Sequence, residues 1–191
     1  MKRPEAEGWA IWVTGLPGSG KSTVARLLKQ NLIKQGIRSQ ILSSDAIRKT
    51  LTPAPCYSED EREMIYRVIV FIAKRLTENR VNVIIDATGN RRRHRDDCRS
   101  QVNKFLEVYL RCPLEVCVSR EESREETFLA PRDIYRKAKT GESHTVPGLG
   151  APYEAPENPE VTADAEKQSP EHIVQAIIDR MKESGLLNSP S

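Results

Sequence analysis

Apolar runs that alternate with helical patterns predict an α/β fold for this chain. Residues 9–14 form a mostly apolar run, as expected for a strand buried on both faces of a parallel sheet. Similar patterns predict further strands at residues 37–43, 81–87, 105–110 and 161–163. Helical spacing and capping signals predict the helices that separate the strands, at residues 21–35, from 58 onward, and at 90–102, 114–122 and 169–183. This order predicts a parallel sheet with helices on both faces.

Two parts of the chain have no clear pattern. Residues 121–132 are charged, and residues 141–160 are rich in Gly and Pro. A long irregular segment in a compact domain is usually a lid or a binding loop, so we expect a mobile lid at about residues 120–150. The C-terminal tail, about residues 185–191, is expected to be loose.

The composition is that of one ordinary globular domain, expected to span residues 1–191. Hydrophobic residues make up 38% and charged residues 30% of the chain, and the net charge of +3 is too small to indicate a nucleic-acid partner. No apolar stretch is long enough to cross a membrane, and no signal peptide is evident. The four cysteines show no CxxC spacing and are expected to be reduced. These features predict a cytoplasmic protein.

The strongest motif follows the first predicted strand directly. Residues 15–22 match G-x-x-x-x-G-K-[ST] at every position and open a predicted helix. Such a loop surrounds phosphate oxygens with backbone N–H groups, while its lysine contacts the β- and γ-phosphates and its hydroxyl residue binds Mg²⁺. The motif therefore predicts a three-layer P-loop NTPase/kinase fold with ATP and Mg²⁺ as cofactors. Lys21 is expected to be catalytic and Ser22 to bind the metal. The expected ATP-binding residues are Gly15, Leu16, Pro17, Gly18, Ser19, Gly20, Lys21, Ser22 and Thr23.

Features outside the loop favour a kinase among the P-loop proteins. A GTPase would carry N-K-x-D, but the corresponding tetrapeptide at residues 103–106 lacks the Asp. The chain is short for a mechanical ATPase, and residues 120–139 supply the arginines and lysines that a kinase lid needs. From this segment, Arg132 and Lys137 are expected to close over the phosphates.

Two carboxylates follow predicted strands at the ligand-binding edge of the sheet. Asp45 is expected to orient the acceptor hydroxyl, accept its proton or help to hold Mg²⁺, although a helix N-cap is an alternative role. Asp86 ends an apolar strand, as in a Walker B motif, and is expected to act in catalysis and to bind Mg²⁺, either directly or through water. Its alternative role is to form a turn.

A dense basic cluster at residues 91–95 is expected to bind phosphate or sulfate through at least one arginine. The alternatives are a solvated helix face and a nucleic-acid patch. Cations at a helix N-terminus oppose its dipole, and a bound anion would offset that cost. The three histidines, His94, His144 and His172, form no metal-ligand pattern and are expected on the surface.

Several segments resemble the adenylylsulfate (APS) kinase family. Residues 42–48 are similar to the family's L-D-G-D-x-x-R, and residues 105–117 are similar to F-x-E-V-x-V-x-x-P-L-E-V-C. Residues 134–138 and 141–142 precede a Y-E-x-P-x-N-P signature at 153–159, which is the most specific of these matches. The resemblance covers about residues 9–178. It implies transfer of phosphate from ATP to the ribose 3′-hydroxyl of adenylylsulfate, and it makes a homodimer an expectation by analogy.

The resemblance also implies acceptor-binding residues. Tyr57 occupies an aromatic position of the family pattern, where it would stack on a nucleobase or only cover the start of a helix. The remaining expected substrate-binding residues are Arg48, Arg62, Arg92, Arg95, Arg132, Lys137 and Leu149.

The chain departs from the family pattern around the expected acceptor site. Ile65 stands where the family has Asn, Gly89 and Asn90 stand where it has Ser and Pro, and Val146 replaces an aromatic residue. Relative to the family pattern, about ten residues are inserted between Arg120 and Arg132. A second hypothesis is therefore a paralogous kinase for another nucleotide-like or small polar alcohol, and a third is a nucleotide-gated binding module without enzymatic activity.

Overall fold

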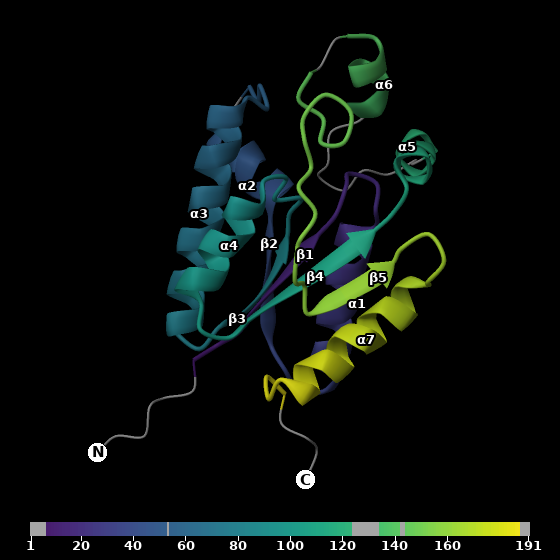
Figure 1. Cartoon of the computed structure of the whole chain (residues 1–191). Helices are drawn as coiled ribbons and strands as arrows, with labels where there is room; N and C mark the ends of the chain where they lie inside the picture. The colour runs from purple at the N-terminus through teal and green to yellow at the C-terminus, as the bar shows by residue number, and fades with distance from the viewer. Residues whose placement is uncertain (1–6, 53, 124–133, 142–143, 188–191) are drawn as a thin grey trace, which may run out of the picture.

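A five-stranded parallel sheet forms the centre of the protein (Figure 1). The computed structural model describes residues 7–52, 54–123, 134–141 and 144–187. The strands are β1 (Ala10–Thr14), β2 (Ser39–Ser43), β3 (Asn82–Asp86), β4 (Phe105–Arg111) and β5 (Val161–Asp164), in the spatial order β2-β3-β1-β4-β5. Every neighbouring pair is parallel, so all carboxyl ends lie at one edge of the sheet.

Helices cover both faces of the sheet and enclose two apolar cores. On one face lie α1 (Lys21–Lys34) and α7 (Pro170–Glu183), and on the other lie α3 (Glu59–Glu78) and α4 (Arg92–Gln101). The central strands are buried from both sides, which explains their nearly continuous apolar sequence. The predicted three-layer α/β architecture is confirmed.

Three short helices lie nearer the carboxyl edge: α2 (Ser44–Leu51), α5 (Leu114–Glu122) and α6 (Ile134–Lys139). The sequence analysis did not predict α6. Its Tyr135 is fully buried and its hydroxyl donates to the Pro17 carbonyl at 2.8 Å, so tertiary contact supports this short helix beside the phosphate-binding loop.

The predicted loose tail begins at residue 185, but residues 185–187 pack against the protein, and residues 188–191 lie outside the described residues. Leu187 is 5% exposed and belongs to the core beneath α1 and α7, and the Leu186 amide donates to the Met181 carbonyl. Two leucines after Gly185 therefore close the apolar face of α7. Among the described residues, none of the helices combines the length and hydropathy that a membrane span requires.

Candidate active site

The glycine-rich loop connects β1 to α1 at the carboxyl edge of the sheet, as predicted. Its conformation depends on glycine at two close approaches: a Cβ at Gly15 would lie 2.7 Å from the Leu110 carbonyl oxygen, and a Cβ at Gly18 would lie 2.3 Å from that of Cys117. Gly20 precedes α1 with φ 98°, and no side chain caps this helix. Nothing lies within 4 Å of a Cβ built at Gly20. The first-turn N–H groups of α1 therefore open onto a space suited to an anion.

Lys21 and Ser22 lie where the loop motif requires them. The Lys21 ammonium donates to the Leu16 carbonyl across the loop at 2.8 Å, while Ser22 and Thr23 are exposed at the start of α1. The lysine is thus held over the loop, and the hydroxyls are open to a ligand.

Thr14 connects the loop with two other segments and was missed by the sequence analysis. Its hydroxyl donates to the Thr88 carbonyl at 2.6 Å and lies 3.0 Å from the Tyr153 hydroxyl. Thr14 is the last residue of a buried strand, and only the fold reveals its partners, 74 and 139 residues away. The phosphate-binding loop, the segment after β3 and the C-terminal segment therefore meet at this threonine.

Asp45 and Asp86 both lie at the carboxyl edge. Asp86 is 9% exposed and is paired in register with Val13 of β1 and with Ser43 of β2. The structure rules out the N-cap role of Asp45: Ser43 caps α2 by accepting from the Ala46 amide at 3.4 Å, and Asp45 lies inside the first turn. Capping of α2 therefore does not account for Asp45.

Two buried arginines lie beside the Tyr57 ring. The guanidinium of Arg48 is 4.5 Å from the centre of the Tyr57 ring, and that of Arg62 is 6.0 Å away. Burial, followed by the charge of Asp45, raises the pKa of the Tyr57 hydroxyl, which places Asp45 in the same neighbourhood. The structure therefore brings together four of the expected site residues, from α2, the following turn and α3.

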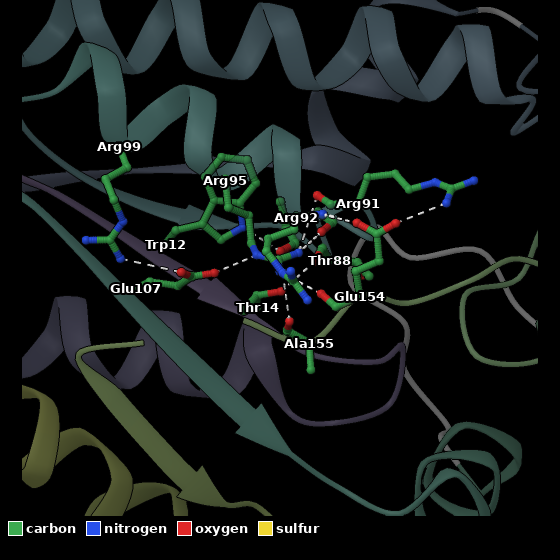
Figure 2. A network of polar contacts seen from close by, with 12 residues as sticks. Trp12, Thr14, Thr88, Arg91, Arg92, Arg95, Arg99, Glu107, Glu154 and Ala155 are labelled. Atoms are coloured by element: carbon green, nitrogen blue, oxygen red, sulfur yellow. Dashed lines mark hydrogen bonds and ion pairs between the residues drawn. The ribbon is translucent and has the colours of Figure 1, made fainter. Parts of the chain in front are cut away.

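The basic cluster at residues 91–95 is turned toward protein carboxylates and carbonyls, as Figure 2 shows for Arg91, Arg92 and Arg95. Arg91 pairs with Glu59 and Glu154, and Arg93 pairs with Glu63. Arg92 pairs with Glu157 and donates to the Ala155 carbonyl. The acidic partners come from α3 and from residues 152–157, here named the strap. These partners offset the cost of cations at the start of α4, and binding of phosphate or sulfate by one of the arginines stays a prediction.

Arg95 corrects a prediction, because it was expected to bind substrate. Its side chain is completely buried and donates to the Glu107 carboxylate at 2.5 Å and to the Glu154 carbonyl at 2.6 Å, with a further bond to the Gly89 carbonyl. Every guanidinium nitrogen thus has a protein partner. Arg95 is a structural residue that links β4, the segment after β3 and the strap (Figure 2).

His94 corrects another prediction, because it is 4% exposed rather than on the surface. Its ring stacks on Tyr66 at 4.4 Å, and Nε2 lies 3.1 Å from the Glu63 carboxylate. Burial lowers the pKa of His94, although Glu63 opposes this shift. His144 and His172 are exposed as expected.

Known proteins share both the sequence and the architecture of this chain. The family model for adenylylsulphate kinase matches residues 7–164. A probable adenylyl-sulfate kinase of Pyrococcus abyssi is 38% identical, with 95% of this chain and 99% of the relative aligned. One from Archaeoglobus fulgidus is 40% identical, over 83% of this chain and 97% of the relative. The chain belongs to the adenylylsulphate kinase family.

A solved family structure agrees with the architecture. The APS kinase CysC of Mycobacterium tuberculosis, in complex with AMPPNP and APS, superposes with a TM-score of 0.81. It is 29% identical, and the match covers 92% of this chain and 98% of that one.

The positions that depart from the adenylylsulphate kinase pattern mostly face the interior. Ile65 is fully buried and packs in the core beneath α3, and Val146 is 6% exposed in the core beneath α1 and α7. Asn90 is completely buried and its amide donates to the Pro152 carbonyl at 3.3 Å. Asn90 therefore binds the strap where the family has Pro.

The lid residues are described in part. Lys137 is exposed on α6, and Leu149 is 46% exposed and lines an open pocket of about 550 Å³ with Leu16 and residues 148 and 150–153. Arg132 lies outside the described residues. Closure of a lid over the phosphates stays a prediction.

Proposed function

We propose that this protein transfers the γ-phosphoryl group of ATP to the 3′-hydroxyl of adenylylsulfate, giving 3′-phosphoadenylylsulfate. The observation that carries this proposal is the intact phosphate-binding loop of a family member, with Asp45, Asp86 and Tyr57 grouped at the same sheet edge. A probable adenylyl-sulfate kinase of Pyrococcus abyssi and an adenylyl-sulfate kinase of Rippkaea orientalis align with 95% and 96% of this chain.

The loop residues would bind the nucleotide. Backbone N–H groups of residues 15–23 would surround the phosphates, and the Lys21 ammonium would leave the Leu16 carbonyl to contact the transferred group. The exposed Ser22 hydroxyl and the Asp86 carboxylate are oxygen donors of the kind that Mg²⁺ prefers, and both belong to this edge. When bound, the ion would neutralise charge on the phosphates.

Asp45 would orient the acceptor hydroxyl and take its proton. Its carboxylate is not needed to cap α2, and it lies near Tyr57 in the region expected for the acceptor. The transferred phosphoryl group is electrophilic once its charge is neutralised. The chain then has only to place the acceptor hydroxyl correctly and to supply a nearby base.

The surroundings of Tyr57 would recognise the acceptor. The Tyr57 ring offers a stacking surface for adenine, and Arg48 and Arg62 provide positive charge beside it for sulfate or phosphate. Val146 is buried in the core, so the second face of the base would need another partner.

A second candidate is a kinase with another alcohol as acceptor. It is favoured by the departures from the family pattern at Ile65, Gly89 and Val146. A homodimer and a cytoplasmic location stay predictions in either case.

The test is an ADP-release assay with ATP and Mg²⁺ across adenylylsulfate, nucleosides and polyols, with the product identified by mass spectrometry. We expect ADP and 3′-phosphoadenylylsulfate to appear together with adenylylsulfate. Turnover with another alcohol, and none with adenylylsulfate, would favour the second candidate.

A further inference from the structure

Tyr57 has a backbone conformation that is uncommon for an aromatic residue. Its φ is 56°, in the left-handed region, and it lies in the turn between α2 and α3. Non-glycine residues in this region persist where the surrounding structure holds them, and such residues cluster at functional sites. Contacts with neighbouring residues must therefore stabilise this conformation of Tyr57.

One carboxylate holds the turn. Glu61 Oε2 accepts from the backbone amide of Cys56 at 2.7 Å and from that of Tyr57 at 3.0 Å. Glu61 Oε1 accepts from the guanidinium of Arg48, and the Glu61 side chain is 5% exposed. A single buried carboxylate therefore fixes two backbone amides and an arginine around the ring.

This arrangement differs from an ordinary capping box. In a capping box the third helical residue, here Glu61, accepts from the amide of the N-cap residue, here Ser58. Ser58 does cap α3, since its hydroxyl accepts from the Glu61 amide at 3.2 Å. The Glu61 carboxylate instead reaches the two residues before the cap. It therefore determines the path of the turn as well as the start of α3.

The backbone carbonyl of Tyr57 is hydrogen-bonded as well. Arg62 Nε donates to the Tyr57 carbonyl at 3.1 Å, and its Nη2 donates to the Thr145 carbonyl. The backbone N–H and C=O of Tyr57 are both hydrogen-bonded, which fixes the backbone from which the ring projects beside Arg48 and Arg62. Burial raises the pKa of Glu61, but hydrogen bonds from Cys56 and Arg48 outweigh this and lower it to about 2, so the carboxylate is charged at neutral pH.

We infer that Glu61 is a positioning residue for the acceptor: its carboxylate holds Tyr57 in the left-handed conformation that directs the ring to the acceptor nucleobase. This inference rests on the proposed function. It predicts that Glu61 acts on acceptor binding through Tyr57 and leaves ATP binding unchanged.

A double-mutant cycle tests this. Glu61→Gln should raise KM for adenylylsulfate about tenfold, with KM for ATP unchanged, because the amide cannot replace both carboxylate oxygens. In a Tyr57→Ala background the same change should alter KM for adenylylsulfate by less than about twofold. Asp60→Asn is the matched control, since it removes an exposed charge from the same helical turn and should change nothing. A full effect of Glu61→Gln in the Tyr57→Ala background would overturn the inference.

Amide exchange provides a readout that is independent of activity. The Cys56 and Tyr57 amides should be protected in the wild type and in Asp60→Asn, and should lose protection in Glu61→Gln without unfolding of α3. Retained protection in Glu61→Gln would overturn the inference even if adenylylsulfate were not the acceptor. Absence of wild-type turnover with adenylylsulfate, in contrast, would refute the proposed function and leave the exchange result to decide on Glu61.

Discussion

Gly89 is the residue where the structure best explains a departure from the family pattern. Its φ is 51°, and a Cβ there would lie 2.9 Å from the Trp12 ring and 3.0 Å from Arg95 Cγ. The Trp12 ring is itself fixed, because its Nε1 donates to the Ala87 carbonyl at 2.9 Å (Figure 2). The serine of the family pattern does not fit this local packing.

We therefore expect Gly89→Ser to reduce the free energy of unfolding by about 1–3 kcal/mol through backbone strain and steric contact. Gly36→Ser is the control: Gly36 also has positive φ, 76°, but nothing lies within 4 Å of its Cβ position. Urea denaturation of both variants would separate strain from contact. Equal decreases in the free energy of unfolding of the two variants would mean that the contact with Trp12 contributes nothing.

The sequence left open whether Asp45 caps α2 or acts in catalysis, and the structure assigns the cap to Ser43. Ser43→Ala should cost about 1 kcal/mol of stability, since it removes the cap of α2. Asp45→Asn should leave stability nearly unchanged and lower kcat far more than it raises KM for ATP, because an amide cannot accept the proton. Thermal unfolding and steady-state kinetics of both variants check this. An unchanged kcat in Asp45→Asn would contradict the catalytic role.

His94 should make stability depend on pH. Its folded pKa is lowered by burial, so below the ordinary value of 6.5 the unfolded chain binds a proton more readily than the folded one. Stability should therefore fall as the pH decreases from 6.5 toward the lowered pKa. Glu63, Arg93 and Glu59 also act on this ring. Urea unfolding at pH 7.5, 6.5 and 5.5 should show a weaker dependence in His94→Phe than in the wild type, while His172→Phe should match the wild type.

At the scale of elements, the strap depends on ion pairs buried beneath it. Glu107 on β4 is 5% exposed and pairs with Arg95 and, at 3.4 Å, with Arg99 of α4. Glu160 receives two bonds from Arg99 and one from the Glu107 amide. The segment 153–159 itself contacts α4, through the Glu154 carboxylate and the carbonyl groups of Glu154 and Ala155.

Glu107→Gln should accordingly cost about 3–5 kcal/mol, because it leaves the buried Arg95 charge poorly compensated. Asp164→Asn, which breaks the exposed pair with Arg111, should cost less than about 1 kcal/mol. Chemical denaturation measures both, and hydrogen exchange of residues 152–157 should increase only in Glu107→Gln. Equal stability losses would contradict the role given to the buried pair.

The elements themselves were largely predictable, because their signals are local. Apolar runs mark the strands. Gly36 follows the end of α1, and Ser58 and Ser169 cap the starts of α3 and α7, so each signal lies next to the boundary it sets. The helix α6 was missed because its support is distant: Tyr135 bonds to Pro17, 118 residues away. The same limit applies to the site. The phosphate-binding loop is a contiguous motif, whereas the burial of His94 and Arg95 depends on Glu63 and Glu107, which only the fold brings close.

At the scale of the whole molecule, the parallel sheet collects the functional groups at one edge. The carboxyl ends of β1, β2 and β3 bring the phosphate-binding loop, Asp45 and Asp86 together, while α5 and α6 lie beyond the same edge (Figure 1). The N-terminal and C-terminal parts of the chain meet there through Thr14 and Tyr153. This arrangement accounts for a kinase in which nucleotide and acceptor approach each other over the sheet edge.

The central claim is phosphoryl transfer to the 3′-hydroxyl of adenylylsulfate, and 3′-deoxyadenylylsulfate tests it most directly. With ATP and Mg²⁺, the wild type should release ADP with adenylylsulfate and none with the 3′-deoxy analogue, which should act as a competitive inhibitor. Lys21→Ala should lower kcat by a factor of about 10²–10³ or more while remaining folded. ADP release that is equal with both compounds, or unchanged in Lys21→Ala, would contradict the account.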